Sequence, residues 1–177
     1  IGKDVPFALL LAIADMPDSV LRAGLDRLQS ADFLDEKGLF PDLEYTFKHA
    51  LTHEVAYGGL LHERRRELHA RIVAAIETLH HDRLGEQTER LADHALRGEL
   101  REKAVDYLRQ AGIKTAARSA LPDARVWFQH ALEVLGTLPQ TPSGLEMGFE
   151  LRVDLRHVLI QFGEIRRAFE RLQEAEV

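Results

Sequence analysis

The stretch "FLDEKGLFPDLEYTFKH", Phe33 to His49, has a different periodicity from the sequence on either side of it. Two turn-forming pairs, Lys-Gly and Pro-Asp, separate a short first segment from a second one in which Tyr45 and Phe47 alternate with polar neighbours. Alternation with a period of two is typical of a half-buried strand, and glycine, proline and aspartate favour turns. The stretch therefore predicts a β-hairpin.

Two helices are expected before this hairpin and another after it. Asp4 followed by Pro6 is a helix-start signal, because the carboxylate can accept a free backbone N–H and proline fits the first turn. We expect one helix from Pro6 to Ala14 and a second from Pro17 to about Ala31, where three leucines share one face at spacing i, i+4, i+7. This order of elements is that of a winged helix that lacks its first helix.

From His62 onward the sequence is helical throughout, and one pattern recurs. Apolar or small residues fall at i, i+4, i+7, i+8 and i+11, so each helix has an apolar face that neighbouring helices must cover. The pattern begins at Leu68, Ala104, Ala124 and Leu151, with a weaker version between 84 and 97. Short turns predict antiparallel packing of consecutive helices. Glycines that favour left-handed helix caps follow at Gly98, Gly136 and Gly163.

A shorter phrase, Ala-x3-large-x2-Ala, repeats within these helices. It occurs as Ala104/Leu108/Ala111, Ala124/Phe128/Ala131 and Ala168/Leu172/Ala175. Small residues at this spacing let two helices approach closely, and the phrase resembles part of the tetratricopeptide repeat (TPR). The expected fold class is mainly α: a partial winged helix with one hairpin over residues 1–61, followed by a TPR-like antiparallel helical repeat array over residues 62–177.

Composition narrows the classes of function. Apolar residues make up 45% of the chain, but no apolar run approaches the roughly 20 residues that span a bilayer, so we expect a cytoplasmic protein without membrane contact. The absence of cysteine excludes disulfides and thiolate sites, and the net charge of −6 weighs against a nucleic-acid partner. Because the chain opens on Ile1 and closes in helix-like sequence, we expect it to be a piece of a longer protein.

The stretch "TFKHALTHEVAY" places His49 and His53 four residues apart, as zinc ligands on one helix face would be. Tyr57 stands where the His-Glu-x-x-His motif needs its second histidine, so that motif is absent. No spacing suggests a serine, acid and histidine set either. We therefore predict neither catalytic nor metal-binding residues, and expect His49 to cap or line the corner between strand and helix. A zinc-dependent hydrolase remains a hypothesis that requires a bound metal ion.

The segment "HERRRELHAR", residues 62–71, is the densest basic cluster. Interleaved glutamates favour a solvated helix face with ion pairs four residues apart. The alternative is a phosphate or partner contact through Arg64, Arg65 and Arg66. Trp127 is a further candidate for a partner contact, at the edge of its helix or in a groove.

Three segments carry a family resemblance. In order, "IGKDVPFALLLAIADMPDSVLRAGLDRLQSADFL", "YTFKHALTHEVAYGGLL" and "RRRELHARIVAAIETL" resemble the region that follows the nucleotide-binding core of bacterial STAND-type signalling ATPases. These include predicted ATPases fused to class III adenylate or guanylate cyclase domains, and large LuxR-type regulators. The resemblance implies a regulatory winged helix that packs on an upstream ATPase domain. It also implies helical repeats that receive a protein or small-molecule ligand.

The resemblance gives His49 a possible role. In related proteins, a histidine at the point where the hairpin meets the next helix contacts the β-phosphate of bound ADP. The segment Phe47-Lys48-His49 corresponds to that point in this sequence. The aspartate that follows the histidine in plant and animal relatives is Ala50 here. The chain has no phosphate-binding Gly-Lys-Ser loop. ATP or ADP and Mg²⁺ would therefore belong to the full-length protein, and this chain would not be an enzyme.

A DNA-binding winged-helix transcriptional regulator, with a helical dimerisation or sensor tail, is the alternative function. Between Asp18 and Lys48 acidic residues outnumber basic ones. A recognition helix and wing with that balance would be repelled by phosphates. The expected function is therefore a regulatory and interaction module that couples sensing by the repeats to the nucleotide state of an ATPase core.

Overall fold

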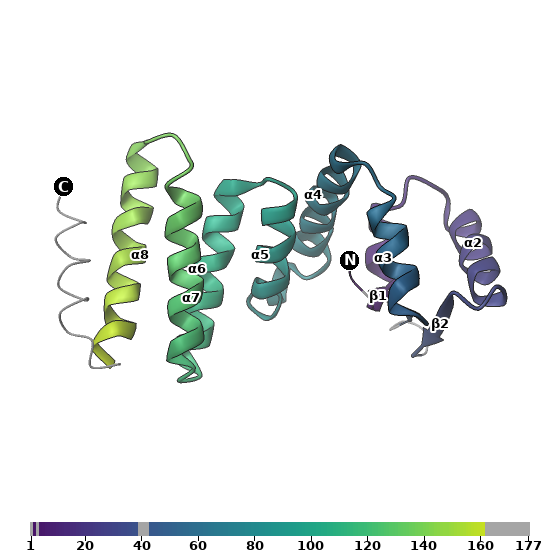
Figure 1. Cartoon of the computed structure of the whole chain (residues 1–177), viewed down its shortest axis with the longest axis horizontal. Coiled ribbons are helices and arrows are strands. Elements are labelled where there is room, and N and C mark those ends of the chain that lie inside the picture. The colour runs from purple at the N-terminus through teal and green to yellow at the C-terminus, as the bar shows by residue number, and fades with distance from the viewer. Residues whose placement is uncertain (1, 3, 39–42, 162–177) are drawn as a thin grey trace. The chain divides into compact units, whose positions relative to one another are not determined.

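The computed structural model describes residues 2, 4–38 and 43–161, and its internal contacts divide the chain into two compact units (Figure 1). The first unit runs from Ile1 to Asp82 and the second from Arg83 to Val177. Each unit has its own buried core.

The first unit contains a three-stranded antiparallel sheet in the order β1-β3-β2. Its strands are β1 (Asp4–Pro6), β2 (Leu34–Lys37) and β3 (Glu44–Phe47). Leu34 lies opposite Phe47 across the hairpin, which confirms the hairpin predicted from the alternating sequence. Val5 lies opposite Tyr45, so β1 pairs with the free side of β3.

Strand β1 corrects the prediction for the start of the chain. Asp4 does not begin a helix: it pairs with Thr46 in the sheet, and the Thr46 hydroxyl donates a 2.7 Å hydrogen bond to the Asp4 carboxylate. Pro6 is tolerated because β1 is an edge strand, where a missing N–H does not interrupt a ladder. The first helix therefore begins at Phe7, whose N–H donates to the Leu43 carbonyl at 2.8 Å.

Four α-helices complete the described part of the first unit. They are α1 (Phe7–Ile13), α2 (Asp18–Ser30), α3 (Ala50–Gly58) and α4 (His62–Leu79). One core cluster joins α1 and α2 to the sheet through Phe7, Leu21, Leu25, Leu34, Leu43 and Tyr45. The order of elements is the one expected for a winged helix without its first helix, with β1 added.

Helix α4 packs on α1 and belongs to the first unit. Its buried face is formed by His69, Ile72, Val73, Ala75 and Ile76. The division between the units follows Asp82, one helix later than the boundary that the sequence suggested after Leu61. The apolar pattern of α4 is the same as that of later helices, so the pattern alone could not show which core it joins.

The second unit is an array of helices, each in contact with the next in sequence. After the 3₁₀ segment η1 (His81–Glu86), which spans the division, the helices are α5 (Thr88–Arg97), α6 (Arg101–Ala117), α7 (Leu121–Leu135) and α8 (Pro142–Gln161). Figure 1 shows α6, α7 and α8 side by side, and α6 also contacts α8. The mainly α fold class is confirmed.

Small residues bring α6 and α7 together as the repeated alanine phrase predicts. Ala104, Ala111, Ala124 and Ala131 are all fully buried. A Cβ atom on Gly112 would lie 2.6 Å from Cε1 of Phe128, so only glycine leaves room for that ring. The third copy of the phrase, Ala168/Leu172/Ala175, lies outside the described residues.

The predicted left-handed glycine caps are wrong where they can be checked. Gly98 has φ −84° and Gly136 has φ −61°, both right-handed. The left-handed conformation falls instead on Glu99 (φ 55°) and Ser119 (φ 61°), within the short α5–α6 and α6–α7 connections. Gly163 lies outside the described residues.

Candidate functional site

His49 occupies the predicted corner between strand and helix. Strand β3 ends at Phe47 and α3 begins at Ala50, with His49 as the extended N-cap residue (φ −123°, ψ 129°). The His49 carbonyl accepts hydrogen bonds from the N–H groups of Thr52 (3.1 Å) and His53 (3.4 Å). The imidazole makes no capping hydrogen bond, and the residue is exposed. The corner is therefore built by the backbone, and the imidazole is not used to cap α3.

Lys48 ties this corner to the connection between α2 and β2. Its ammonium group hydrogen-bonds to Asp32 and lies 3.8 Å from Asp35, while its backbone N–H donates to the Phe33 carbonyl at 3.1 Å. The hydrogen bond between Lys48 and Asp32 raises the pKa of the lysine and lowers the pKa of the aspartate. The contacts of Lys48 thus fix the chain immediately before His49.

His53 does not join His49 in a common site. Its ring packs edge-on to Phe47, with 5.2 Å between ring centres, and stacks on Tyr57 at 6.2 Å. The Tyr57 hydroxyl in turn shares a 3.0 Å hydrogen bond with Nε2 of His69 on α4. Tyr57 and His69 are site residues that sequence reasoning missed, although Tyr57 was noted as the residue in the place of a second zinc ligand.

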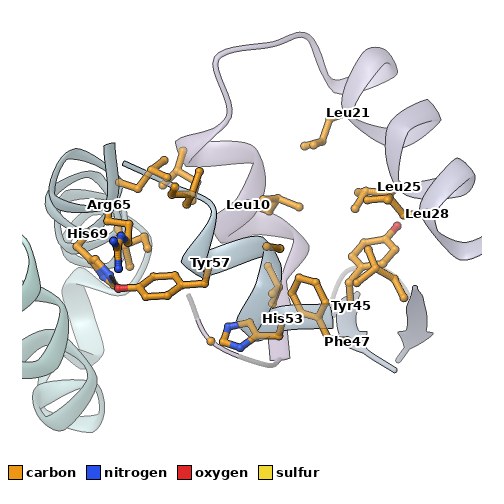
Figure 2. Close-up of a pocket in the computed structure, with 18 residues that line it drawn as sticks. Leu10, Leu21, Leu25, Leu28, Tyr45, Phe47, His53, Tyr57, Arg65 and His69 are labelled. Carbon is orange, nitrogen blue, oxygen red and sulfur yellow. Dashed lines mark hydrogen bonds between the residues drawn. The ribbon is translucent and has the colours of Figure 1, made fainter. Parts of the chain in front are cut away.

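This ring series forms part of the wall of a cavity of about 440 Å³ within the first unit (Figure 2). Side chains from α1, α2, α3, α4 and the sheet line it, and most of them are apolar. In Figure 2, Tyr57, Arg65 and His69 gather on one side of the cavity, and Leu21, Leu25 and Leu28 of α2 lie on the other. The guanidinium group and the His69 imidazole therefore lie at one end of the cavity, and the leucines of α2 lie at the other, beside the Tyr45 hydroxyl.

The three consecutive arginines that are candidates for a partner contact have different surroundings. Arg64 donates to Glu67 at 2.7 Å and lies 3.9 Å from Asp15. Arg71, two turns further on, binds Asp15 with both terminal nitrogens, with 2.6 Å between Nη2 and Oδ1, and this hydrogen bonding lowers the pKa of Asp15. Arg66 is exposed and also has a partner within the chain.

Arg65 differs from its neighbours because it turns toward the cavity. Its guanidinium carbon lies 5.3 Å from the centre of the Tyr57 ring. Its Nε atom is buried and has no hydrogen-bond partner in the part of the chain that the structure describes. Because protein atoms cover Nε, a ligand in the cavity could contact Arg65 only through its other atoms.

Trp127 belongs to the second unit and is partly buried on α7. Its neighbour Phe128 is 1% exposed and fills the space over Gly112, which places Phe128 in the core. Trp127 is therefore at an edge of the helix, and it remains a candidate contact of the helical array.

Three of the basic residues that could contact DNA lie beside carboxylates. Arg22 forms a 2.9 Å ion pair with Asp18 and lies over the ring of Phe7. Lys37 is 4.0 Å from Asp4, and Lys48 binds Asp32. These pairs reduce the positive charge that the first unit could offer to phosphates.

Metal-ligating residues are scattered rather than clustered. Across residues 2, 4–38 and 43–161, no group of three histidine, aspartate or glutamate side chains could hold a metal ion. Within the same residues, no helix is long and apolar enough to cross a membrane.

No protein-family model matches the chain, and no solved structure matches it. The chain is 32% identical over 141 residues, 79% of its length, to the uncharacterized protein R02095 of Rhizobium meliloti (strain 1021). The matched stretch is 14% of that protein. The chain thus spans a small part of the relative that it matches.

Proposed function

We propose that this chain is the regulatory and protein-interaction region of a larger, cytoplasmic STAND-type signalling ATPase. Its helical array would bind a protein or small-molecule partner, and its first unit would report that binding to an ATPase core that precedes it. The observation that carries the proposal is the placement of His49, an exposed N-cap residue between β3 and α3 whose imidazole is not used for capping.

The chemistry of this corner suits a phosphate. The N-terminus of a helix carries a partial positive charge and presents backbone N–H groups, and an imidazole N–H beside it adds a donor. The β-phosphate of ADP held by the upstream core would accept these hydrogen bonds. ATP, ADP and Mg²⁺ are proposed as ligands of that core and not of this chain, which would itself catalyse no reaction.

Two further observations support the proposal. The relative in Rhizobium meliloti is several times longer than the matched stretch, so this region occurs there as part of a large protein. Helices α5–α8 form the kind of stacked array that binds partners along its surface. The pairing of Arg22, Lys37 and Lys48 with carboxylates weighs against the alternative of DNA binding.

The test compares His49→Ala with His62→Ala in the full-length protein that contains this chain. His62 is an exposed histidine at the start of α4, so it controls for the loss of an imidazole at a helix N-terminus. Loss of a hydrogen bond to a charged phosphate costs about 1.5–3 kcal/mol, and His49→Ala should release bound ADP roughly 10- to 100-fold faster. Basal signalling should rise because the ADP-held state is loosened.

The measurement is the amount of ADP that remains bound after purification, together with the rate at which it dissociates. His62→Ala should behave as the unaltered protein does. If His49→Ala retains ADP as well as His62→Ala, the nucleotide-sensing role of His49 is wrong.

A further inference from the structure

The cavity of the first unit has the size of a small-molecule site. Its volume of about 440 Å³ lies within the range of roughly 300–1,000 Å³ that is typical of ligand pockets. Well-packed protein interiors contain few voids larger than a water molecule. Water would find few partners along the leucine wall formed by α2, because buried water needs two to four polar contacts. An apolar ligand would fill this space better than water.

The polar end of the cavity defines the head group of the ligand. Arg65 lines this end of the cavity and supplies its positive charge, with its guanidinium carbon 5.3 Å from the centre of the Tyr57 ring. The two terminal Nη groups of an arginine can donate a pair of hydrogen bonds to the two oxygens of a carboxylate. The ring of Tyr57 lies under the guanidinium and its hydroxyl is held by His69, so the two helices α3 and α4 fix this end.

The charge at this end favours a carboxylate over a phosphate. One guanidinium balances the single charge of a carboxylate, whereas a phosphate monoester carries about 1.5 to 2 charges at pH 7. The excess charge would be left among apolar side chains, which is costly. Asp15 and Glu67, the nearby acids that neutralise Arg64 and Arg71, form pairs outside this cavity lining.

The length of the ligand follows from the volume. At roughly 30 Å³ for each water-sized group, the cavity of about 440 Å³ holds at most about 15 non-hydrogen atoms. We propose that the first unit binds a medium-chain carboxylic acid, with the carboxylate on Arg65 and the acyl chain against Leu21, Leu25 and Leu28. This site is separate from the His49 corner and does not depend on the presence of an ATPase core.

The test titrates the full chain with octanoate, 1-octanol and octylamine, which share a chain length and differ in the head group. Octanoate should bind with a Kd of about 0.1 to 1 mM, as a ligand of this size allows, and about tenfold or more tightly than the other two. Amide NMR shifts measure the affinity and should locate the change at α2, α3 and α4. Absence of saturable binding by octanoate up to about 5 mM would overturn the proposal.

Substitutions at Arg65 test the contribution of the ligand's head group to binding separately from that of its acyl chain. Arg65→Gln should weaken octanoate binding about tenfold and remove the preference over 1-octanol, whereas Arg65→Lys, which keeps the charge, should retain part of that preference. Arg66→Gln is the matched control at the exposed neighbour and should leave all three affinities unchanged. An equal loss of octanoate affinity in the Arg65→Gln and Arg66→Gln variants would show non-specific electrostatic attraction. That result would overturn the proposed site.

Leu28→Phe tests the leucine-lined end of the cavity. Leu28 is 43% exposed and lines the cavity, so a larger side chain can enter the space without disturbing a fully buried position. It should weaken octanoate and 1-octanol together. Unchanged affinities in a variant whose thermal unfolding matches that of the unaltered chain would place the ligand elsewhere.

Discussion

Gly112 on α6 leaves room for the ring of Phe128 on α7. A Cβ at this position would meet three ring atoms at 2.6 to 2.9 Å, and the ring is buried and cannot withdraw. Gly112→Ala should therefore destabilise the second unit by about 1–2 kcal/mol, because overpacking of about 1–3 kcal/mol exceeds the gain in helix propensity. Urea unfolding followed by the fluorescence of Trp127, the single tryptophan, measures this change.

Gly24 on α2 is the matched control for this prediction. It is an exposed helical glycine, and an added Cβ would meet nothing within 4 Å. Gly24→Ala should stabilise the first unit by about 0.5–1 kcal/mol and leave the Trp127 transition unchanged. An equal response of the two variants would mean that the contact with Phe128 is not what excludes a side chain at 112.

Between elements, Glu89 on α5 and Lys114 on α6 form a 2.7 Å ion pair that links the two helices. Burial raises the pKa of Glu89, but hydrogen bonds from Lys114 and Thr88 outweigh it and leave the pKa below its usual value of 4.5. The stabilisation from this carboxylate is therefore complete above about pH 5 and is lost as the pH falls through the lowered pKa. The second unit loses unfolding free energy between about pH 5 and 3, and Glu89→Gln should make this loss smaller. The difference should be less than about 1 kcal/mol, because the ion pair is partly exposed.

The measurement for this pair is the urea midpoint of the Trp127 transition across that pH range. Glu102→Gln, an exposed acid in the first turn of α6, provides the comparison. If both variants flatten the pH profile equally, the effect is one of net charge and not of the link between α5 and α6.

The elements that the sequence predicts correctly are those with a local cause. The hairpin follows from turn residues and alternating side chains within residues 33–49, and α2 follows from leucines three and four residues apart. The corner at His49 was predicted because a strand end and a helix start are adjacent in sequence. Such features depend on residues that are close together in the sequence, so a local pattern is enough to indicate them.

The features that were missed have partners far away in the chain. Strand β1 contains three residues, one of which is a proline, and it exists because β3 offers it a free edge. The hydrogen bond between Tyr57 and His69 and the orientation of Arg65 depend on how α3 and α4 pack. The cavity needs four helices and all three strands at once, so no local pattern in the sequence could have indicated it.

At the scale of the whole molecule, two compact units imply two unfolding units. Phe128→Ala in the second unit should cost about 3–5 kcal/mol, and Leu25→Ala in the first, where Leu25 is 5% exposed, about 2–5 kcal/mol. Hydrogen exchange followed by mass spectrometry should show each loss of protection only in the unit that carries the substitution.

Each of the two variants is the control for the other. Phe128→Ala should speed exchange in α5–α8 and leave β1–α4 protected, whereas Leu25→Ala should do the reverse. The physical reason is that the cores of the two units are built from different side chains, and a cavity in one core removes contacts only there. If either substitution speeds exchange throughout residues 4–161, the chain unfolds as one cooperative body and the division after Asp82 has no energetic meaning.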